Sequence, residues 1–251
     1  MVNKRYTAVI VGAGPAGIAA AVQLKRYGVD FAIFEKSSIG GLINEANFVE
    51  NYPGLPNGIP GSKFAALLRK HLDNFGIAPA FAEVRKIYYD GGFKILTENG
   101  ETTGEFCILA SGTIPKPLKL PLEGDIPISR SVLDLKKEKN RRIVIIGGGD
   151  AAIDYALNLA SDNDITVISR SRLTAIPAIL QRAYEHPRIE IIYGFKIRSI
   201  FKDGDTVNIK IMKDGKPIAV EADAVLAATG RDPELSLLLD KNLINNDKLY
   251  L

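Results

Sequence analysis

The sequence is poor in the residues that build disulfides and metal centres. Its 251 residues include one cysteine, Cys107, and two histidines, His71 and His186. A single cysteine excludes an internal disulfide, a Cys-x-x-Cys redox pair and a cysteine-rich zinc site. Two widely separated histidines argue against a histidine-based metal site. We therefore expect no metal centre in this chain.

The sequence also lacks a strong charge of either sign and a long apolar run. The 32 Lys and Arg residues and 29 Asp and Glu residues leave a formal net charge of +3, which is too small to predict a nucleic-acid or membrane surface. No stretch approaches the roughly 18 continuous apolar residues of a membrane-spanning helix. Residues 4–22 resemble a signal peptide, but three glycines and a proline interrupt the apolar run. We expect a cytoplasmic protein.

The composition is that of an ordinary globular chain. Hydrophobic residues make up 46% and charged residues 24%, which excludes the low hydrophobicity and high charge of disordered segments. The length predicts one large domain or two modest ones. The one excess is glycine, with 23 residues, and the positions of these glycines point to the function.

Two segments of the chain repeat one another. Residues 6–24 read YTAVIVGAGPAGIAAAVQL, and residues 142–159 read RIVIIGGGDAAIDYALNL. The glycines of the first, Gly12, Gly14 and Gly17, align with Gly147, Gly149 and Ala152, 135 residues further along the chain. In each copy a short apolar strand precedes the glycine turn and a small-residue helix follows it. The second strands, at 31–35 and 165–170, align at the same offset without a gap.

Each copy continues into a similar tail. Residues 84–97 form two predicted strands around an Asp-Gly-Gly turn, residues 197–212 do the same around Asp-Gly, and an apolar strand ending at Gly112 or Gly230 follows. The pattern predicts an α/β fold with two Rossmann-like, doubly wound dinucleotide-binding domains, each with a small antiparallel meander. Prolines at 115, 117, 121 and 233 mark the two crossings between the domains.

The first glycine turn fits the G-x-G-x-x-G dinucleotide fingerprint. A strand precedes it, a helix follows it, and Glu35 stands 23 residues after Gly12, in the position of the acid that accepts from a ribose hydroxyl. Gly12 permits the tight turn, Gly14 lets the backbone approach a diphosphate, and Gly17 lets helix and strand pack closely. This site should take FAD or NAD. The alternative is that the glycines only permit tight packing.

The second turn fits the variant of the fingerprint that ends in alanine. In place of the acid, the aligned strand ends in Ser169-Arg170, with Arg172 two residues further on. Arginine binds a 2′-phosphate with charge-assisted hydrogen bonds, whereas an acid would repel it. The second site should therefore prefer NADP(H), with NAD(H) as the alternative if both arginines are only solvated surface charges.

Two dinucleotide sites in one chain predict electron transfer between two cofactors. A flavin and a nicotinamide are the sensible pair, because hydride passes readily between them. The protein then supplies binding and orientation, and we name no catalytic residue.

The arrangement resembles the low-molecular-weight thioredoxin reductase family of flavoproteins over residues 5–251. The motifs that show the resemblance are VIVGAGPAG at 9–17, GGL at 40–42, VENYPG at 49–54, ASGT at 110–113, GGGD at 147–150 and ATGR at 228–231. It implies an FAD-binding domain at 1–115 and 232–251, with an NAD(P)H-binding domain at 116–231 inserted between its parts. It also implies a homodimer. The resemblance adds these cofactor-binding residues: Pro15, Ala16, Lys36, Gly41, Leu42, Asn51, Val84, Ala110, Ser111, Gly112, Asp150, Ala151 and Gly230.

One departure from the family concerns the redox cysteines. Thioredoxin reductases have a Cys-x-x-Cys just before the second glycine turn, where this chain reads SRSVLD at 129–134. Cys107, in an apolar strand, is expected to be an inert core residue. The usual dithiol relay to thioredoxin is thus excluded. Residues 149–159 resemble instead the related ferredoxin–NADP reductases, so the expected acceptor is ferredoxin, flavodoxin or a quinone.

A second departure is at the end of the chain. Family members continue past the strand predicted at 248–251 into a Gly-Asp motif and a helix that close over the flavin. Two functions follow. The first is an FAD-dependent NAD(P)H oxidoreductase with a non-disulfide acceptor. The alternative is a non-catalytic NADP(H)-binding or sensing protein that does not retain flavin.

Three smaller features have ordinary structural explanations. His71 belongs to a predicted helix at 62–75 and is expected on its surface. The basic stretch at 136–142 is expected to be a solvated face, with docking of an acidic electron carrier as the alternative. Tyr52 is expected either to stack on the flavin or to belong to the core.

Overall fold

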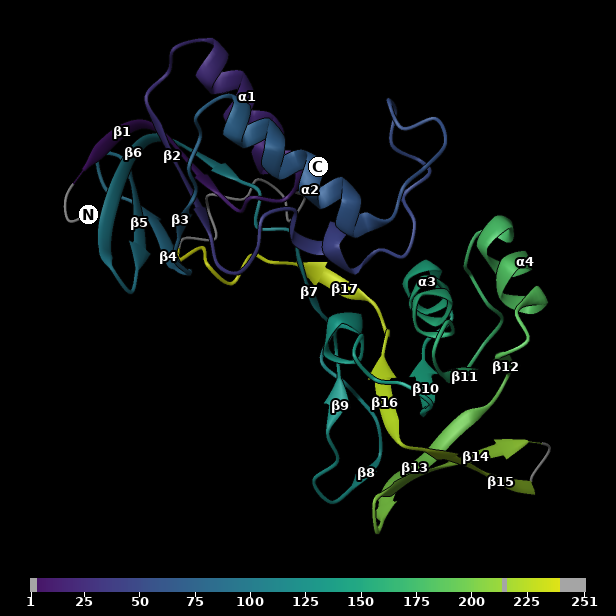
Figure 1. Ribbon diagram of the computed structural model, residues 1–251. Coiled ribbons are helices and arrows are strands. Elements are labelled where there is room, and N and C mark those ends of the chain that lie inside the picture. The colour runs from purple at the N-terminus through teal and green to yellow at the C-terminus, as the bar shows by residue number, and fades with distance from the viewer. Residues whose placement is uncertain (1–3, 214–215, 240–251) are drawn as a thin grey trace. The chain divides into compact units, whose positions relative to one another are not determined.

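The computed structural model describes residues 4–213 and 216–239, and the strand predicted at 248–251 lies outside them. Contacts divide the chain into two compact units (Figure 1). The first comprises residues 1–44, 61–114 and 233–251, and the second comprises residues 45–60 and 115–232. The chain passes between them four times, at 44/45, 60/61, 114/115 and 232/233. The last two passages lie in β7 (Thr113–Pro115) and β17 (Arg231–Pro233), which pair with each other.

The first unit is built on a six-stranded sheet. Its order is β3-β2-β1-β6-β5-β4, with β1, β2, β3 and β6 parallel and β4, β5 and β6 forming an antiparallel meander. The elements are β1 (Arg5–Val11), α1 (Pro15–Arg26), β2 (Phe31–Glu35), the short 3₁₀ helix η1 (Gly41–Glu45), α2 (Gly61–Asn74), β3 (Ala80–Phe81), β4 (Val84–Tyr89), β5 (Phe93–Thr97) and β6 (Gly100–Leu109).

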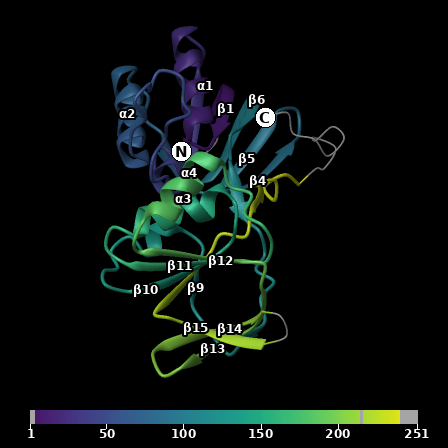
Figure 2. The same ribbon diagram turned by 90° about the vertical axis from the view of Figure 1, so that its right-hand side faces the viewer.

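Both faces of this sheet are covered, as expected for parallel strands that are continuous apolar runs. Helices α1 and α2 lie together on one side of it (Figure 2). On the other side Val9, Val11 and Phe34 pack against Ile87 and Ile95 of the meander. The strand predicted before the first glycine turn, the strands predicted at 31–35 and within 84–97, and the helix predicted at 62–75 are thus confirmed.

The second unit repeats this plan with a separate meander. Its five-stranded parallel sheet has the order β12-β11-β10-β16-β9, and a four-stranded sheet has the order β15-β14-β13-β8. The elements are β8 (Leu122–Glu123), β9 (Ile128–Ser129), η2 (Val132–Asp134), β10 (Arg142–Ile146), α3 (Asp150–Leu159), β11 (Asp164–Ser169), α4 (Pro177–Glu185), β12 (Ile189–Tyr193), β13 (Lys196–Asp203), β14 (Thr206–Lys213), β15 (Lys216–Ala222) and β16 (Ala224–Ala227).

Alternate side chains of β10 serve two separate cores. Ile143 and Ile145 pack with the buried residues of α3, whereas Val144 and Ile146 pack with Ile200 and other residues of the four-stranded sheet. Helices and meander accordingly lie on opposite faces of the parallel sheet (Figure 2). The α/β class with two doubly wound units and two meanders is confirmed.

The alignment of the two repeats requires one correction. Val11 pairs with Phe34 in the first unit, but its counterpart Ile146 pairs with Ile168 in the second. The offset therefore falls from 135 to 134 between the first and second strands, because the second copy is one residue shorter between them. Glu35 corresponds in register to Ser169, the last residue of β11, and not to Arg170 as the ungapped alignment predicts. Arg170 follows the strand, in the register of Lys36.

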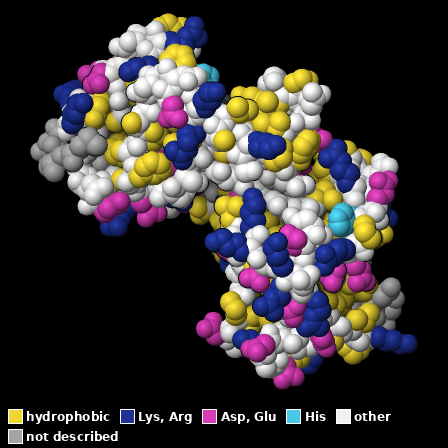
Figure 3. Space-filling view, viewed as in Figure 1, with side chains coloured by type: hydrophobic (Ala, Val, Ile, Leu, Met, Phe, Trp, Pro, Cys, Tyr) yellow, Lys and Arg dark blue, Asp and Glu magenta, His cyan; other side chains and the backbone are white. Residues whose placement is uncertain are grey.

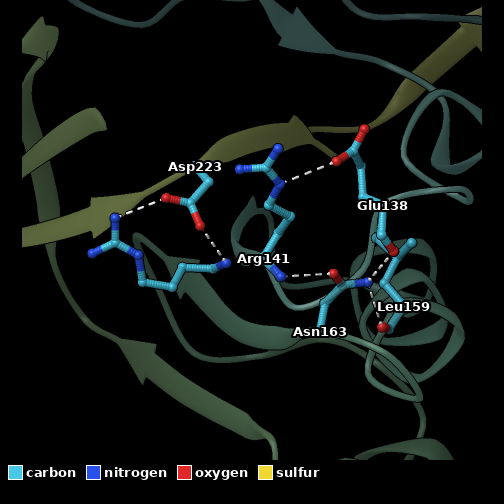
Figure 4. A network of polar contacts seen from close by, with 6 residues as sticks. Glu138, Arg141, Leu159, Asn163 and Asp223 are labelled. Carbon is cyan, nitrogen blue, oxygen red and sulfur yellow. Dashed lines mark hydrogen bonds and ion pairs between the residues drawn. The ribbon is translucent and has the colours of Figure 1, made fainter. Parts of the chain in front are cut away.

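A polar network joins the start of β10 to the end of α3 (Figure 4). The buried Asn163 donates from Nδ2 to the carbonyls of Glu138 (2.9 Å) and Leu159 (3.1 Å), and its Oδ1 accepts from the N–H of Arg141 (3.1 Å). Asp223 accepts from the backbone N–H and the guanidinium of Arg142, which lowers the pKa of the Asp223 carboxyl. Both arginines of the basic stretch are therefore paired within the chain.

Charged side chains of both signs are mixed on the surface of the second unit. Lys and Arg side chains of the second unit lie among Asp and Glu side chains on the face shown in Figure 3. Lys139 and Arg141 approach Asp162 and Glu138, which favours the expectation of a solvated face for residues 136–142. Among the residues that the structure describes, no helix has the length and apolar character needed to cross a membrane.

Candidate functional site

The first glycine turn is shaped by two glycines that the fold itself requires. Gly12 has φ +104°, and a Cβ there would overlap the carbonyl oxygen of Ala110. A Cβ on Gly17 would overlap the carbonyl oxygen of Gly12. These contacts bring α1 close against the strand ends, because β1 and β6 are neighbours in the sheet. Tight packing inside the protein is therefore enough to explain why Gly12 and Gly17 are glycines.

Gly14 has no such explanation. Its φ of −75° and ψ of −178° suit any residue, and no atom lies within 4 Å of the position that a Cβ would occupy. It immediately precedes α1 and makes no side-chain cap, so the free N–H groups of the first helical turn face the same opening. An approaching anion such as a diphosphate accounts for a glycine here.

Glu35 lies at the end of β2, beside this turn. Its side chain is buried and its Oε2 accepts from the N–H of Ala13 at 2.7 Å, while Oε1 accepts from the N–H of Ser37 at 2.9 Å. Ser37 Oγ also donates to Oε1, at 3.3 Å. These three bonds hold the carboxylate in one orientation, and its remaining lone pairs can accept hydrogen bonds from ribose hydroxyls. The exposed Lys36 follows it.

The loop at 40–42 packs on the same turn. The N–H of Gly40 donates to the carbonyl of Ala13 at 2.8 Å, and the Cβ position of Gly41 lies 3.5 Å from the Cα of Gly14. Leu42 is half-exposed beside them. The structure thus brings the predicted residues at 12–17, 35–36, 41–42 and 110–112 together in the first unit.

Val84 approaches this group from the meander. It is buried at the start of β4, two residues after Ala82, whose N–H donates to the carbonyl of Glu35 at 3.0 Å. Ser111 donates from Oγ to the carbonyl of Glu234 at 2.8 Å. The Ser111 side chain therefore binds the segment of the first unit that follows β17.

The second glycine turn repeats the first in detail. Gly147 has φ +156°, and a Cβ there would overlap the carbonyl oxygen of Ala228, just as Gly12 meets Ala110. Gly149 has φ −95° and ψ −176°, and a Cβ there would meet only Thr174 Oγ1, at an ordinary 3.7 Å. The middle glycine again faces an opening. Ala151 is exposed and Ala152 is buried on the first turn of α3.

The region after β11 is cationic. Arg170 and Arg172 are exposed, and within residues 4–213 and 216–239 neither guanidinium has an ion-pair partner. Ser169, which the sequence reasoning did not assign, is buried where the first unit has Glu35. The exposed Gly230, with φ +102°, accepts from the N–H of Lys116 at 3.0 Å.

Asn51 groups with the second unit, whereas the other residues predicted around FAD belong to the first. It belongs to residues 45–60, which group with the second unit although they lie within the predicted FAD-binding domain. The Glu45 carboxylate accepts from Ser131 Oγ (3.0 Å) and Tyr155 Oη (2.6 Å), and Asp154 accepts from the N–H of Asn47 (2.8 Å). Burial raises the pKa of Asp154 and is the largest cause of the raised pKa of Tyr155. Sequence spacing contains no signal for these contacts, because the partners lie about a hundred residues apart.

Tyr52 is 45% exposed, so it is not a core residue.

Cys107 is partly buried in β6 beside the first unit's core, and desolvation raises the pKa of its thiol to about 11, as expected for an inert thiol. Ser131, in the stretch where the related family has cysteines, caps η2 by accepting from the N–H of Leu133 at 3.2 Å. Within the described part of the chain, no cluster of three His, Cys, Asp or Glu side chains forms a metal site.

A cavity of about 620 Å³ in the first unit lies elsewhere. Tyr6, Phe31, Phe34, Ala80 and Thr102 are among its lining residues, and none of the predicted cofactor-binding residues lines it. A dinucleotide binds in extended form across strand ends, so the glycine turns define the candidate sites better than this cavity does.

Comparison with known proteins agrees with this geometry. A family model described as pyridine nucleotide-disulphide oxidoreductase matches residues 6–248. A thioredoxin reductase of Treponema pallidum is 33% identical over 247 residues, which cover 94% of this chain and 80% of the relative. A protein of Clostridium pasteurianum described as a 34.2 kDa protein in a rubredoxin operon is 28% identical, over 97% of this chain and 82% of its own.

Solved structures of thioredoxin reductases have the same fold. The Lactococcus lactis enzyme, in its FR conformation, superposes with a TM-score of 0.82 at 29% identity, over 92% of this chain and 80% of the other. The T. acidophilum enzyme also gives 0.82, at 30% identity, over 93% and 80%.

Proposed function

This chain belongs to the pyridine nucleotide-disulphide oxidoreductase family, and from that premise we propose that it transfers electrons from NADPH through FAD to an acceptor other than a protein disulfide. Ferredoxin, flavodoxin and quinones are the candidate acceptors. Thioredoxin reductase-like members of the family bind FAD and NADPH. The chain is accordingly a flavin-dependent oxidoreductase, and the acceptor is the new element of the proposal.

The observation that supports two cofactors best is the pair of middle glycines. The backbone angles of Gly14 and Gly149 are ones that any residue can adopt. At both positions the surrounding protein atoms leave room for a Cβ. Each lies at the N-terminus of a helix, where free N–H groups and the helix dipole attract an anion. The residues present therefore fit two dinucleotide diphosphates.

The two sites differ in what lies at the strand end, which supports FAD in the first and NADPH in the second. Glu35 can accept from ribose hydroxyls in the first unit. In the second, Ser169 removes that acid, and two exposed arginines without ion-pair partners in the described chain follow it. When bound, the flavin would accept hydride from the nicotinamide and pass the electrons on singly or in pairs. The chain's own residues bind and orient the two cofactors.

The chemistry of the chain supports a non-disulfide acceptor. A dithiol relay needs two cysteines, and this sequence has only Cys107, whose pKa is raised to about 11 by burial. Several relatives are named thioredoxin reductase. Reduction of thioredoxin by a dithiol relay requires thiol–disulfide exchange between cysteines of the reductase and the disulfide of thioredoxin. The Clostridium pasteurianum relative is described by its place in a rubredoxin operon and not as a thioredoxin reductase.

An anaerobic absorption spectrum of the purified protein, with FAD supplied, tests the proposal. We expect a flavin spectrum that bleaches on addition of NADPH. The bleached protein should be reoxidised by ferredoxin, flavodoxin or a quinone, and not by oxidised thioredoxin. Reoxidation by thioredoxin at a rate comparable with any of these would contradict the assigned acceptor class. A protein that binds NADPH yet retains no flavin once unbound FAD has been removed by gel filtration would favour a non-catalytic nucleotide-binding role.

A further inference from the structure

We propose that Asp150 is a positioning residue that sets the preference for NADPH over NADH, because it holds the loop that contains Arg170 and Arg172. The inference rests on the proposed function, since it assigns the 2′-phosphate of NADPH to these arginines. The family resemblance groups Asp150 with residues that contact the cofactor. In the structure, its carboxylate binds the chain itself.

The arginine loop, residues 170–176, connects β11 to α4 and folds back over the second glycine turn. The N–H of Thr174 donates to the carbonyl of Gly148 at 2.7 Å, and the N–H of Ile176 donates to Asp150 Oδ1 at 2.8 Å. Ser169 anchors the other end of the loop as the last residue of β11. Residues 170–175 lie between Ser169 and the Ile176 bond, with the Thr174 bond among them, so the backbone that carries both arginines is held at both ends of the loop and at Thr174.

The position of Asp150 explains how a carboxylate is tolerated beside a diphosphate site. Asp150 is the first residue of α3, and Ile176 is the N-cap of α4. The carboxylate therefore lies at the N-termini of two helices, each of which has a partial positive charge. Its hydrogen bond to Ile176 is charge-assisted, and these interactions offset a charge that would otherwise oppose the diphosphate.

The loop contacts bear on specificity more than on binding in general. Arg170 and Arg172 are exposed, and no ion pair within the described residues fixes the position of either guanidinium. A guanidinium gains most from a phosphate when its fork is oriented in advance. Releasing the loop should weaken contacts to the 2′-phosphate and leave the diphosphate site at Gly149 unaffected.

Calorimetric titration of the full chain with 2′,5′-ADP and with 5′-AMP tests the proposal without relying on turnover. The two probes differ only in the 2′-phosphate, so the ratio of their dissociation constants measures its recognition. We expect the wild-type protein to bind 2′,5′-ADP more tightly. Asp150→Ala should lower the ratio about tenfold, as loss of a charge-assisted contact implies. Asp150→Asn should retain most of it, because the amide oxygen still accepts.

The other side of the same hydrogen bond provides an independent variant. Ile176 has φ −63° and ψ 145°, which proline adopts, so Ile176→Pro removes the donor N–H at a position whose own backbone angles suit proline. It should lower the ratio as Asp150→Ala does. The double variant should be no worse than either single one, since both remove one interaction. Asp205→Ala, an exposed carboxylate in the turn after β13, is the matched control and should leave the ratio unchanged.

The outcomes separate the two proposals. An unchanged ratio in Asp150→Ala and Ile176→Pro, or an equal loss of affinity for both probes, overturns the positioning role alone. A wild-type protein with no preference for 2′,5′-ADP overturns the NADPH assignment and the positioning role together. If Asp150→Ala does not fold, as judged by circular dichroism, Ile176→Pro decides by the same criterion.

Discussion

At the scale of single residues, the glycines of one fingerprint divide into two kinds. Gly12 and Gly17 are required by packing, because a Cβ on either would overlap a backbone carbonyl. Gly14 is free of such contacts and has ordinary backbone angles. The motif therefore combines residues that build the turn with a residue that leaves room for a ligand.

We expect Gly17→Ala to lower the free energy of unfolding by about 1–3 kcal/mol, the usual cost of overpacking. Gly14→Ala should change it by no more than about 0.5 kcal/mol, because a weaker helix cap is offset by a less flexible unfolded chain. Urea unfolding of the protein without FAD, followed by circular dichroism, measures both. Equal destabilisation by the two variants would show that Gly14 also has a packing role.

At the scale of elements, strand β10 is held at its start by side chains from distant parts of the second unit. Asn163 uses its amide for three hydrogen bonds and is 1% exposed. Its bonds join the connection before β10 to the end of α3, which fixes how that helix meets the sheet. The position of the second glycine turn, between β10 and α3, depends on this junction.

Replacing Asn163 by Leu should destabilise the protein by about 2–4 kcal/mol, because one N–H and two carbonyls would lose their partner in a buried place. Thermal unfolding should show a lower Tm. Asn57→Leu, at an exposed position, serves as the control and should leave the Tm nearly unchanged. A similar Tm for both variants would mean that water replaces the lost bonds.

At the scale of the whole molecule, the two units repeat one binding device with different strand ends. The middle glycine of each turn belongs to one unit, and each turn is closed by contacts within its own unit, Gly12 to Ala110 and Gly147 to Ala228. The two sites should therefore fail independently when either glycine is replaced.

We expect Gly14→Ala to weaken FAD binding about tenfold or more while affinity for 2′,5′-ADP stays within about twofold of the wild type, because a methyl group obstructs only the first diphosphate site. Gly149→Ala should show the reverse. Flavin absorbance after reconstitution and calorimetry with 2′,5′-ADP measure the two affinities. Loss of both ligands in either variant would mean that the sites are coupled or that the fold has been damaged.

The sequence by itself determined the class of fold, the two glycine turns and Glu35. These features follow from local patterns, since apolar strands, glycine spacing and helix starts depend on residues close together in the chain. The same patterns predicted β2 at its observed bounds and α2 within one residue at each end. The absent cysteine pair is likewise a property of composition.

Only the tertiary structure decided the features that depend on distant partners. The one-residue shift that aligns Ser169 with Glu35 is visible only in strand pairing. Residues 45–60 group with the second unit because Glu45 and Asn47 bind side chains of α3, and Glu45 also binds Ser131, the N-cap residue of η2. The partner of the Asp150 carboxylate lies 26 residues away. Such contacts are set by how packed elements meet, and no periodicity or spacing in the chain encodes them.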